Sequence, residues 1–132
     1  MRTPQPPVAV AISFVDRINR ADTAGLSTLM SADHELRVFD EEPVIGRAAN
    51  AEAWAAYFAD FPDYVLYPRT LAADGQMVAI LGHTTGSHLG LDDDAEARLT
   101  LIWLVRARDG EVLSWTPLED TPAHRSAYGL GR

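Results

Sequence analysis

Asp40 is the side chain in this sequence whose position best suits proton transfer. From His34 to Asp40 the chain has a period of two, which predicts a strand with Leu36, Val38 and Asp40 on one face. An aspartate at the end of an apolar strand face would lie at the mouth of an apolar cavity, where loss of water makes a carboxylate a stronger base. Alternatively, Asp40 turns outward and accepts a hydrogen bond from a loop amide.

His83 and His88 could exchange a proton with such a base. Both belong to the strand-like run Met77–Gly90, and a neutral imidazole suits acid–base work near pH 7. Regular strand geometry points the two rings to opposite faces, so at most one faces a cavity unless a bulge at Gly86 intervenes. The alternative is that each histidine is a structural or interface residue.

The sequence predicts neither a metal site nor a cofactor. His83 and His88 are five residues apart, and the acidic triplet Asp92–Asp94 lacks the glycine and distal glutamate of a calcium loop. We interpret this triplet as a solvated turn. The chain contains no cysteine, which excludes disulfides, thiol catalysis and cysteine-bound metals.

The charge balance restricts the possible partners. Nineteen acidic and eleven basic residues give a net charge of −8, the wrong sign for binding nucleic acid or anionic membranes. Neutral or cationic partners are favoured. A signal-peptide pattern and an apolar run of membrane-spanning length are both missing from the sequence, so we expect a cytoplasmic protein.

The elements that must position these side chains begin with helices. With 132 residues, 47% of them hydrophobic, the chain fits a single domain over 1–132 with its own core. Prolines make 1–7 a flexible leader, and apolar spacing predicts a helix over 6–20. A second short helix is capped by Asp22 or Thr23.

A third helix, beginning near Ala48, carries a stripe of aromatic side chains. Such a stripe predicts burial against a sheet, and in a hollow fold the same side chains would form the wall of a cavity for a planar, apolar ligand. The candidate wall residues, including two tryptophans from later strands, are Trp54, Tyr57, Phe58, Trp103 and Trp115.

Strands dominate the second half. Tyr64–Leu71 is a strand whose Pro68 indicates an edge or a bulge. Tight turns at Ala73–Gln76 and Arg108–Glu111 predict two hairpins. The runs that these turns join or flank are Met77–Gly90, Ala97–Ala107 and Val112–Leu118.

The two faces of the run Ala97–Ala107 differ in character. One face is wholly apolar and is assigned to the core; it consists of Leu99, Leu101, Trp103 and Val105. The other is mixed and would suit a homodimer interface; it consists of Arg98, Thr100, Ile102, Leu104 and Arg106.

The element order resembles the cone-shaped α+β fold of the nuclear transport factor 2-like (NTF2-like) superfamily. Within it, motifs over about residues 8–130 are similar to the SnoaL-like polyketide cyclase family: Gly46-Arg47, Phe61-Pro62-Asp63, Gly82-His83-Thr84-Thr85-Gly86, and Arg108-Asp109-Gly110-Glu111-Val112 followed by Trp115 and Asp120. The resemblance implies a strongly bent antiparallel or mixed sheet, wrapped around N-terminal helices, with an internal pocket. It implies no single activity, because this scaffold hosts isomerases, cyclases, hydrolases and binders.

The resemblance bears on specific residues. Asp40 matches the proton-shuttling aspartate of ketosteroid isomerase-like members, but their oxyanion donors are missing, since Phe14 and a position near Ile102 or Trp103 replace them. Steroid isomerisation is therefore disfavoured. Asp120 resembles the family's C-terminal carboxylate.

Our sequence-based hypothesis is a domain that binds a small apolar, aromatic or polyketide-like molecule in an aromatic pocket to which Phe14 also contributes. Asp40 would be the base of an isomerase, cyclase or hydrolase reaction, with His83, His88 or Asp120 as its acid partner. The alternative is a non-catalytic ligand-binding or homodimerisation module.

Overall fold

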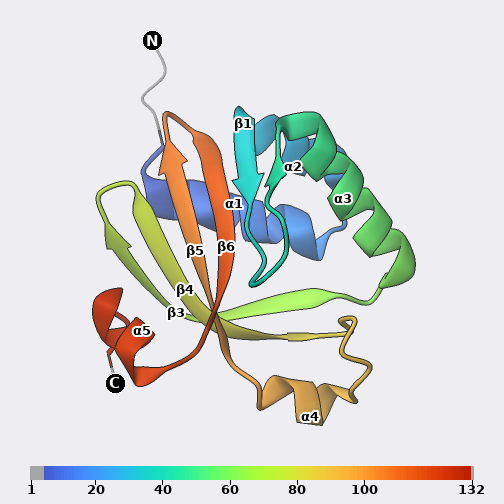
Figure 1. Cartoon of the computed structure of the whole chain (residues 1–132), viewed down its shortest axis with the longest axis vertical. Helices are drawn as coiled ribbons and strands as arrows, with labels where there is room; N and C mark the ends of the chain where they lie inside the picture. The colour runs from blue at the N-terminus through green and yellow to red at the C-terminus, as the bar shows by residue number, and fades with distance from the viewer. Residues whose placement is uncertain (1–4, 132) are drawn as a thin grey trace.

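The computed structural model, which describes residues 5–131, consists of helices grouped around one curved sheet (Figure 1). Residues 1–4 of the predicted leader lie outside this range, and the first helix begins at Pro7, a residue well suited to the first helical position. In chain order the elements are α1 (Pro7–Asn19), α2 (Thr23–Leu29), β1 (Met30–Leu36), β2 (Val44–Ile45), α3 (Arg47–Asp60), β3 (Val65–Asp74), β4 (Met77–Thr85), α4 (Asp93–Ala97), β5 (Leu101–Arg108), β6 (Glu111–Glu119) and α5 (Pro122–Ala127).

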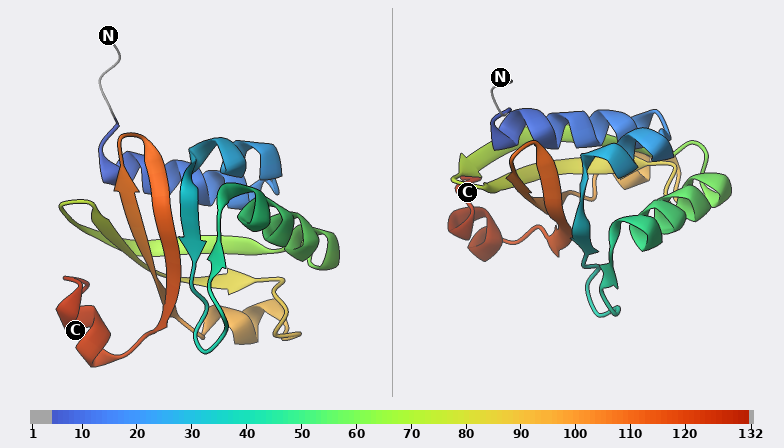
Figure 2. Two further views of the ribbon diagram at one scale, coloured as in Figure 1. Left: turned by 45° about the horizontal axis from the view of Figure 1, so that its top comes forward. Right: turned by 90° about the horizontal axis from the view of Figure 1, so that it is seen from above.

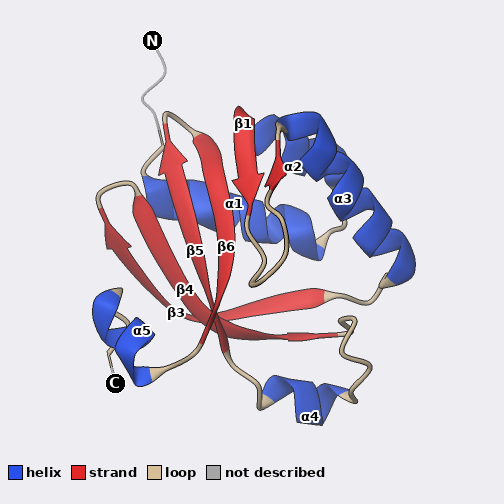
Figure 3. Ribbon diagram, viewed as in Figure 1, coloured by secondary structure: helices blue, strands red, loops and turns tan. Residues whose placement is uncertain are grey.

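The sheet has six strands in the order β2-β1-β6-β5-β4-β3 (Figure 3). β1 and β6 run parallel, and every other neighbouring pair is antiparallel. The α+β fold with a bent, mixed sheet and N-terminal helices is therefore confirmed.

The two faces of the sheet are covered by opposite ends of the chain. On the inner face, Val78, Ile80, Trp103 and Val105 pack with side chains of α1 and α3. On the outer face, Ala79, Leu81, Ile102 and Leu104 pack with Leu130, just after α5. Figure 2 shows α1 and α5 on opposite sides of the strands.

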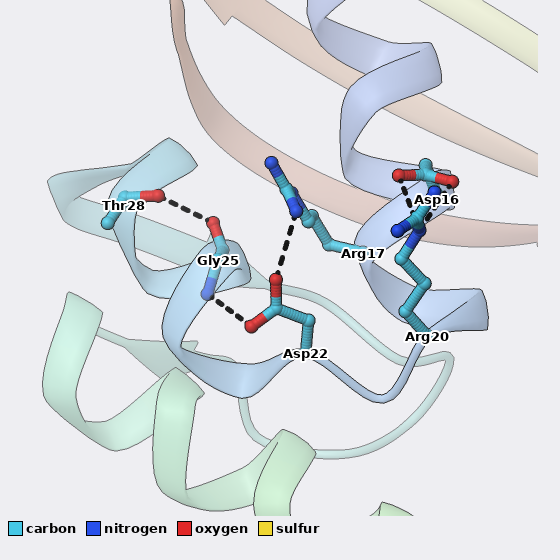
Figure 4. Close-up of polar contacts among 6 residues, drawn as sticks. All are labelled: Asp16, Arg17, Arg20, Asp22, Gly25 and Thr28. Atoms are coloured by element: carbon cyan, nitrogen blue, oxygen red, sulfur yellow. Dashed lines mark hydrogen bonds and ion pairs between the residues drawn. The ribbon is translucent and has the colours of Figure 1, made fainter.

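The helical hairpin at the N-terminus is held by local polar contacts (Figure 4). The side chain of Asp22 caps α2 by accepting a hydrogen bond of 2.9 Å from the Gly25 amide. Asp22 also pairs with Arg17 of α1 at 3.1 Å, which ties the two helices together. The predicted pair of helices is therefore confirmed, with Asp22 as the cap.

The predicted hairpin turns are confirmed. Asp109 and Gly110 both have positive φ, 55° and 81°, which is the conformation of the two-residue turn that suits the twist of antiparallel strands. β3 is an outer strand, and its register shifts between Pro68 and Thr70. Pro68 thus marks both an edge and a bulge, as predicted.

Asn50, buried on α3, holds the β1–β2 loop in place. Its amide nitrogen donates to the carbonyl oxygens of His34, Val44 and Gly46 at 3.0, 3.0 and 2.9 Å. Because these bonds reach both ends of residues 37–43, they fix the loop relative to α3. This loop forms one side of the cavity described below.

Some predicted strand boundaries are wrong. β1 ends at Leu36 and not at Asp40, β4 ends at Thr85, and β5 begins only at Leu101. The acidic triplet is exposed, as predicted, but it is not a turn: Asp92 accepts a hydrogen bond of 2.8 Å from the Ala95 amide and caps α4, which begins at Asp93.

The mixed face of β5 is covered by the chain itself. Ile102 is fully buried and Leu104 is 8% exposed, because the C-terminal segment with Tyr128 and Leu130 packs over them. The middle of that face is therefore not free to contact a second molecule in the way that the sequence analysis expected. Homodimerisation stays a prediction. Among the described helices, none has the length and apolar character needed to cross a membrane.

Candidate functional site

A cavity of about 640 Å³ opens between α3, the β1–β2 loop, α4 and the inner face of the sheet. In Figure 1, α3 lies at the right, α4 at the lower right and the β1–β2 loop near the centre. The volume suits a ligand of one to a few rings. Its walls are formed by Leu36, Val38, Phe39, Glu41, Glu42, Val44, Ala53, Trp54, Tyr57, Tyr64, Thr84, Ser87, His88, Leu89, Glu96, Leu99, Leu101, Trp103, Trp115 and Pro117.

Four of the six aromatic residues predicted for the pocket lie on its wall: Trp54, Tyr57, Trp103 and Trp115. The other two, Phe14 and Phe58, do not line the cavity, which corrects their prediction. Phe14 is fully buried and packs behind the wall, with its ring centroid 5.1 Å from that of Trp115. Phe58 packs against Trp54 at 5.5 Å.

Tyr57 and His88 form a hydrogen-bonded pair on the cavity wall. The Tyr57 hydroxyl oxygen lies 2.8 Å from Nδ1 of His88 and accepts a 3.2 Å hydrogen bond from the His88 amide. If Nδ1 carries the imidazole proton, it also donates to Tyr57, which leaves Nε2 as a free base and the phenol proton free to donate elsewhere. The pair can therefore present a base and a hydrogen-bond donor together.

Glu96 is a buried carboxylate in the same wall. It is 1% exposed, and it accepts hydrogen bonds from the Thr84 hydroxyl and, at 3.4 Å, from the Ser87 amide. None of the ion pairs found within residues 5–131 involves it. Sequence reasoning missed Glu96, because a buried acid inside an acidic run carries no distinguishing pattern.

The surroundings hold the phenols of the cavity in their protonated form. Burial raises the pKa of Tyr57, and the charge of nearby Glu96 raises it further. The hydrogen bond from the His88 amide to the phenol oxygen lowers the pKa in part. Burial also raises the pKa of Tyr64, with smaller contributions from Tyr57 and Glu96. Both side chains line the cavity, so both can donate a hydrogen bond to a ligand over the physiological pH range.

Asp40 is not where the sequence placed it. It lies in the turn after β1, is exposed and does not line the cavity, although its neighbours Phe39 and Glu41 do. The reason is that β1 ends at Leu36 and the chain turns at Phe39, whose φ is positive at 39°, so the alternation of side chains no longer applies at residue 40. Its predicted cavity position is wrong.

His83 also lies away from the cavity. Its ring stacks on Tyr67 of the neighbouring strand at 4.7 Å, and its Nδ1 accepts a hydrogen bond of 3.1 Å from Arg69. Partial burial, followed by the Arg69 charge, lowers the pKa of His83. The His83 side chain, on β4, thus contacts side chains of the neighbouring strand β3.

Asp120 joins the last strand to α5. Its two carboxylate oxygens accept hydrogen bonds of 2.6 and 2.7 Å from Arg125, and it also accepts one from Thr100. Hydrogen bonding from Arg125 lowers the pKa of Asp120 to about 2. Asp120 is outside the cavity lining and is ionised at neutral pH, so this geometry does not let it serve as an acid toward a cavity ligand.

Within residues 5–131, no group of three or more histidine, aspartate or glutamate side chains is arranged to hold a metal ion. Of the four candidate catalytic residues, only His88 lines the cavity. The structure adds Tyr57 as its direct partner and Glu96 as a buried charge.

One protein family has a model that matches most of this chain. A model of the SnoaL-like domain matches residues 11–115. A search among curated proteins found no match.

Among solved structures, a proposed SnoaL-like polyketide cyclase from Jannaschia sp. CCS1 is 18% identical with a TM-score of 0.69, covering 100% of this chain and 99% of that one. A proposed polyketide cyclase from Sinorhizobium meliloti is 19% identical with a TM-score of 0.70, covering 83% and 94%. A cystatin-fold protein from Novosphingobium aromaticivorans is 14% identical with a TM-score of 0.73, covering 87% and 99%. At sequence identities this low, the three matches show that the fold is shared and nothing more.

Proposed function

This chain belongs to the SnoaL-like domain family, and we propose that its cavity binds a small apolar or polyketide-like carbonyl compound and catalyses proton transfer on it. The observation that carries the proposal is the Tyr57–His88 pair, in which the phenol oxygen and Nδ1 are 2.8 Å apart on the wall of an aromatic cavity. The fold alone does not select a reaction, so the proposal rests on this pair.

In the proposed step, Nε2 of neutral His88 removes a proton from the carbon next to the ligand carbonyl. The electrons of the broken C–H bond move to the carbonyl oxygen, where the Tyr57 hydroxyl donates a hydrogen bond to the forming enolate. Return of the proton at another carbon is an isomerisation. Attack of the enolate carbon on a second carbonyl, whose oxygen then takes the proton back from the His88 imidazolium, is an aldol cyclisation. The sequence contains no lysine, so the enolate forms without a lysine Schiff base.

His88 replaces Asp40 as the proposed base because a base must reach the ligand. His88 lines the cavity and its ring is accessible, whereas Asp40 points to solvent. Tyr57 supplies the donor that the sequence lacks at Phe14 and near Trp103. Its raised pKa keeps the phenol protonated until the enolate forms.

The first test is a thermal-shift screen with steroids, terpenoids, aromatic polyketides and small aromatic acids. A ligand at a hundred times its dissociation constant adds about 2.7 kcal/mol to the free energy of unfolding, which gives a visible shift. Exchange of the α-proton of a bound carbonyl ligand in D₂O, followed by NMR, then reports proton transfer directly.

The variants that decide the proposal are His88→Ala and Tyr57→Phe, with His83→Ala as a matched control outside the cavity. We expect His88→Ala to slow the exchange about 10²–10⁴-fold and Tyr57→Phe to slow it less, with His83→Ala unchanged. Ligand binding without any exchange in the wild-type protein would instead identify a non-catalytic binding module.

A further inference from the structure

The charges of the cavity wall are all of one sign. Glu96 is buried in the wall, and Glu41 and Glu42 lie at the exposed side formed by the β1–β2 loop. All eleven basic residues of the sequence are arginines, and none of those described lines the cavity. A ligand in this cavity therefore meets negative charge without a compensating guanidinium.

Aromatic rings form most of the remaining surface. Trp54, Tyr57, Tyr64, Trp103 and Trp115 all contribute to the wall. Their ring contacts within the described chain are with other aromatic rings and with histidine, and none is with an arginine. The faces of aromatic rings attract cations, and proteins bind quaternary ammonium groups with such cages.

The burial of Glu96 indicates which charge a ligand of this cavity should carry. A buried carboxylate is stabilised when it is paired with a positive charge and is unfavourable otherwise. Within the described part of the chain its hydrogen-bond partners are neutral: the hydroxyl of Thr84 and the amide of Ser87. A cation in the cavity would supply the missing opposite charge.

We infer that the cavity selects ligands that carry a positive charge, such as a protonated or quaternary amine, on an aromatic or apolar body, and that Glu96 is the residue that selects the charge. The inference rests on the proposed function in that the cavity must bind a ligand, but it does not require His88 to transfer a proton. It narrows the ligand class from apolar compounds in general to amines.

Three probes of similar shape and different charge test the inference: naphthylmethyl-trimethylammonium, naphthylmethanol and naphthylacetate. Isothermal titration of the wild-type protein should show about tenfold tighter binding of the cation than of the neutral alcohol, and the weakest binding for the carboxylate. Equal or tighter binding of the alcohol or the carboxylate would overturn the inference.

The Glu96→Gln variant should bring the cation close to the alcohol in affinity while leaving the alcohol unchanged. Glu119→Gln is the matched control, since Glu119 is exposed on β6 outside the cavity lining and the substitution removes the same charge. An equal loss of cation preference in Glu119→Gln would mean that net charge alone is responsible, and would also overturn the inference.

The outcomes separate this inference from the proposed function. Binding of the alcohol with no preference for the cation would contradict the amine inference and leave the proton-transfer proposal to the exchange experiment with His88→Ala. Failure of all three probes to bind would count against both. If Glu96→Gln does not fold, an order of affinities in which the cation is not the tightest ligand of the wild-type protein still overturns the inference.

Discussion

Glu96 and Asp120 are both largely buried carboxylates, yet their surroundings differ. Asp120 lies between β6 and α5, where Arg125 binds both of its oxygens at 2.6 and 2.7 Å. Glu96 lies in the cavity wall, where its partners among residues 5–131 are one hydroxyl and one amide. The paired acid holds two elements together, while the acid without a cation lies where a ligand can approach. Charge pairing, more than burial, distinguishes the structural region from the candidate site.

The largest effect on stability is expected for β5, which has one face toward the cavity and the other toward the C-terminal segment. Trp103 faces the cavity and the inner core and is 2% exposed. We expect Trp103→Ala to lower the free energy of unfolding by about 3–5 kcal/mol, as for other large buried aromatics. Urea denaturation measures this, with Ile102→Val, on the outer face, as a milder control of about 0.5–1.5 kcal/mol. A loss below about 1 kcal/mol for Trp103→Ala would show that the cavity side contributes little to the core.

The next largest effect should come from the paired acid. Because the pKa of Asp120 is about 2 in the folded protein and 3.8 in its ordinary state, the unfolded chain binds a proton first as the pH falls. Its contribution to stability is complete above about pH 4 and is lost toward pH 2, by about 1–2 kcal/mol in total. Urea midpoints across this range should decline less in Asp120→Asn. An identical decline in both proteins would show that the Arg125 pair does not stabilise the fold.

His34, buried on the inner side of the sheet, should make the free energy of unfolding depend on pH. Its Nδ1 lies 2.7 Å from the Val112 carbonyl oxygen, and its buried Nε2 has no partner among the described residues. Burial lowers the pKa of His34, and the Val112 bond only partly offsets this. Since the unfolded chain takes up the proton first, stability should fall as the pH drops below about 6.5. His34→Gln should reduce that slope and leave the part that His83 contributes through its own lowered pKa, and an unchanged slope would assign it to another group.

The smallest effect is expected at Asp40, the acid that belongs to neither region. Because its side chain is exposed in a turn, Asp40→Asn should change the free energy of unfolding by no more than about 0.5 kcal/mol. The binding of naphthylmethanol and the α-proton exchange should also be unchanged. Loss of exchange in this variant would restore Asp40 as the base and contradict the role proposed for His88.

The sequence was sufficient for features that depend on local chemistry. Asp22 as a cap, the Asp109-Gly110 turn and the break at Pro68 follow from backbone preferences of a few adjacent residues. The alternation of β5 was also readable, although both of its faces proved to be buried. These features together suffice to recognise the fold.

The site was less predictable because it depends on irregularities and distant contacts. β1 ends at Leu36 and the chain turns at Phe39, so the period of two does not extend to Asp40 and parity placed this residue in the cavity incorrectly. Glu96 looks like its acidic neighbours in sequence, and only the packing of α4 against β4 buries it. The contact between Tyr57 and His88 joins residues 31 positions apart, which no local pattern indicates.

The bulge at Pro68 also has a consequence for the behaviour of the protein at high concentration. β3 is an outer strand of ten residues, and an exposed strand edge of that length invites strand addition by another molecule, which leads to aggregates or fibrils. Pro68 has no N–H to offer an incoming strand, and the register shift beside it disturbs the regular edge. At the opposite edge, β2 is only two residues long. Both margins of the sheet are therefore poor templates for further strands, which protects the open, curved sheet from growing between molecules.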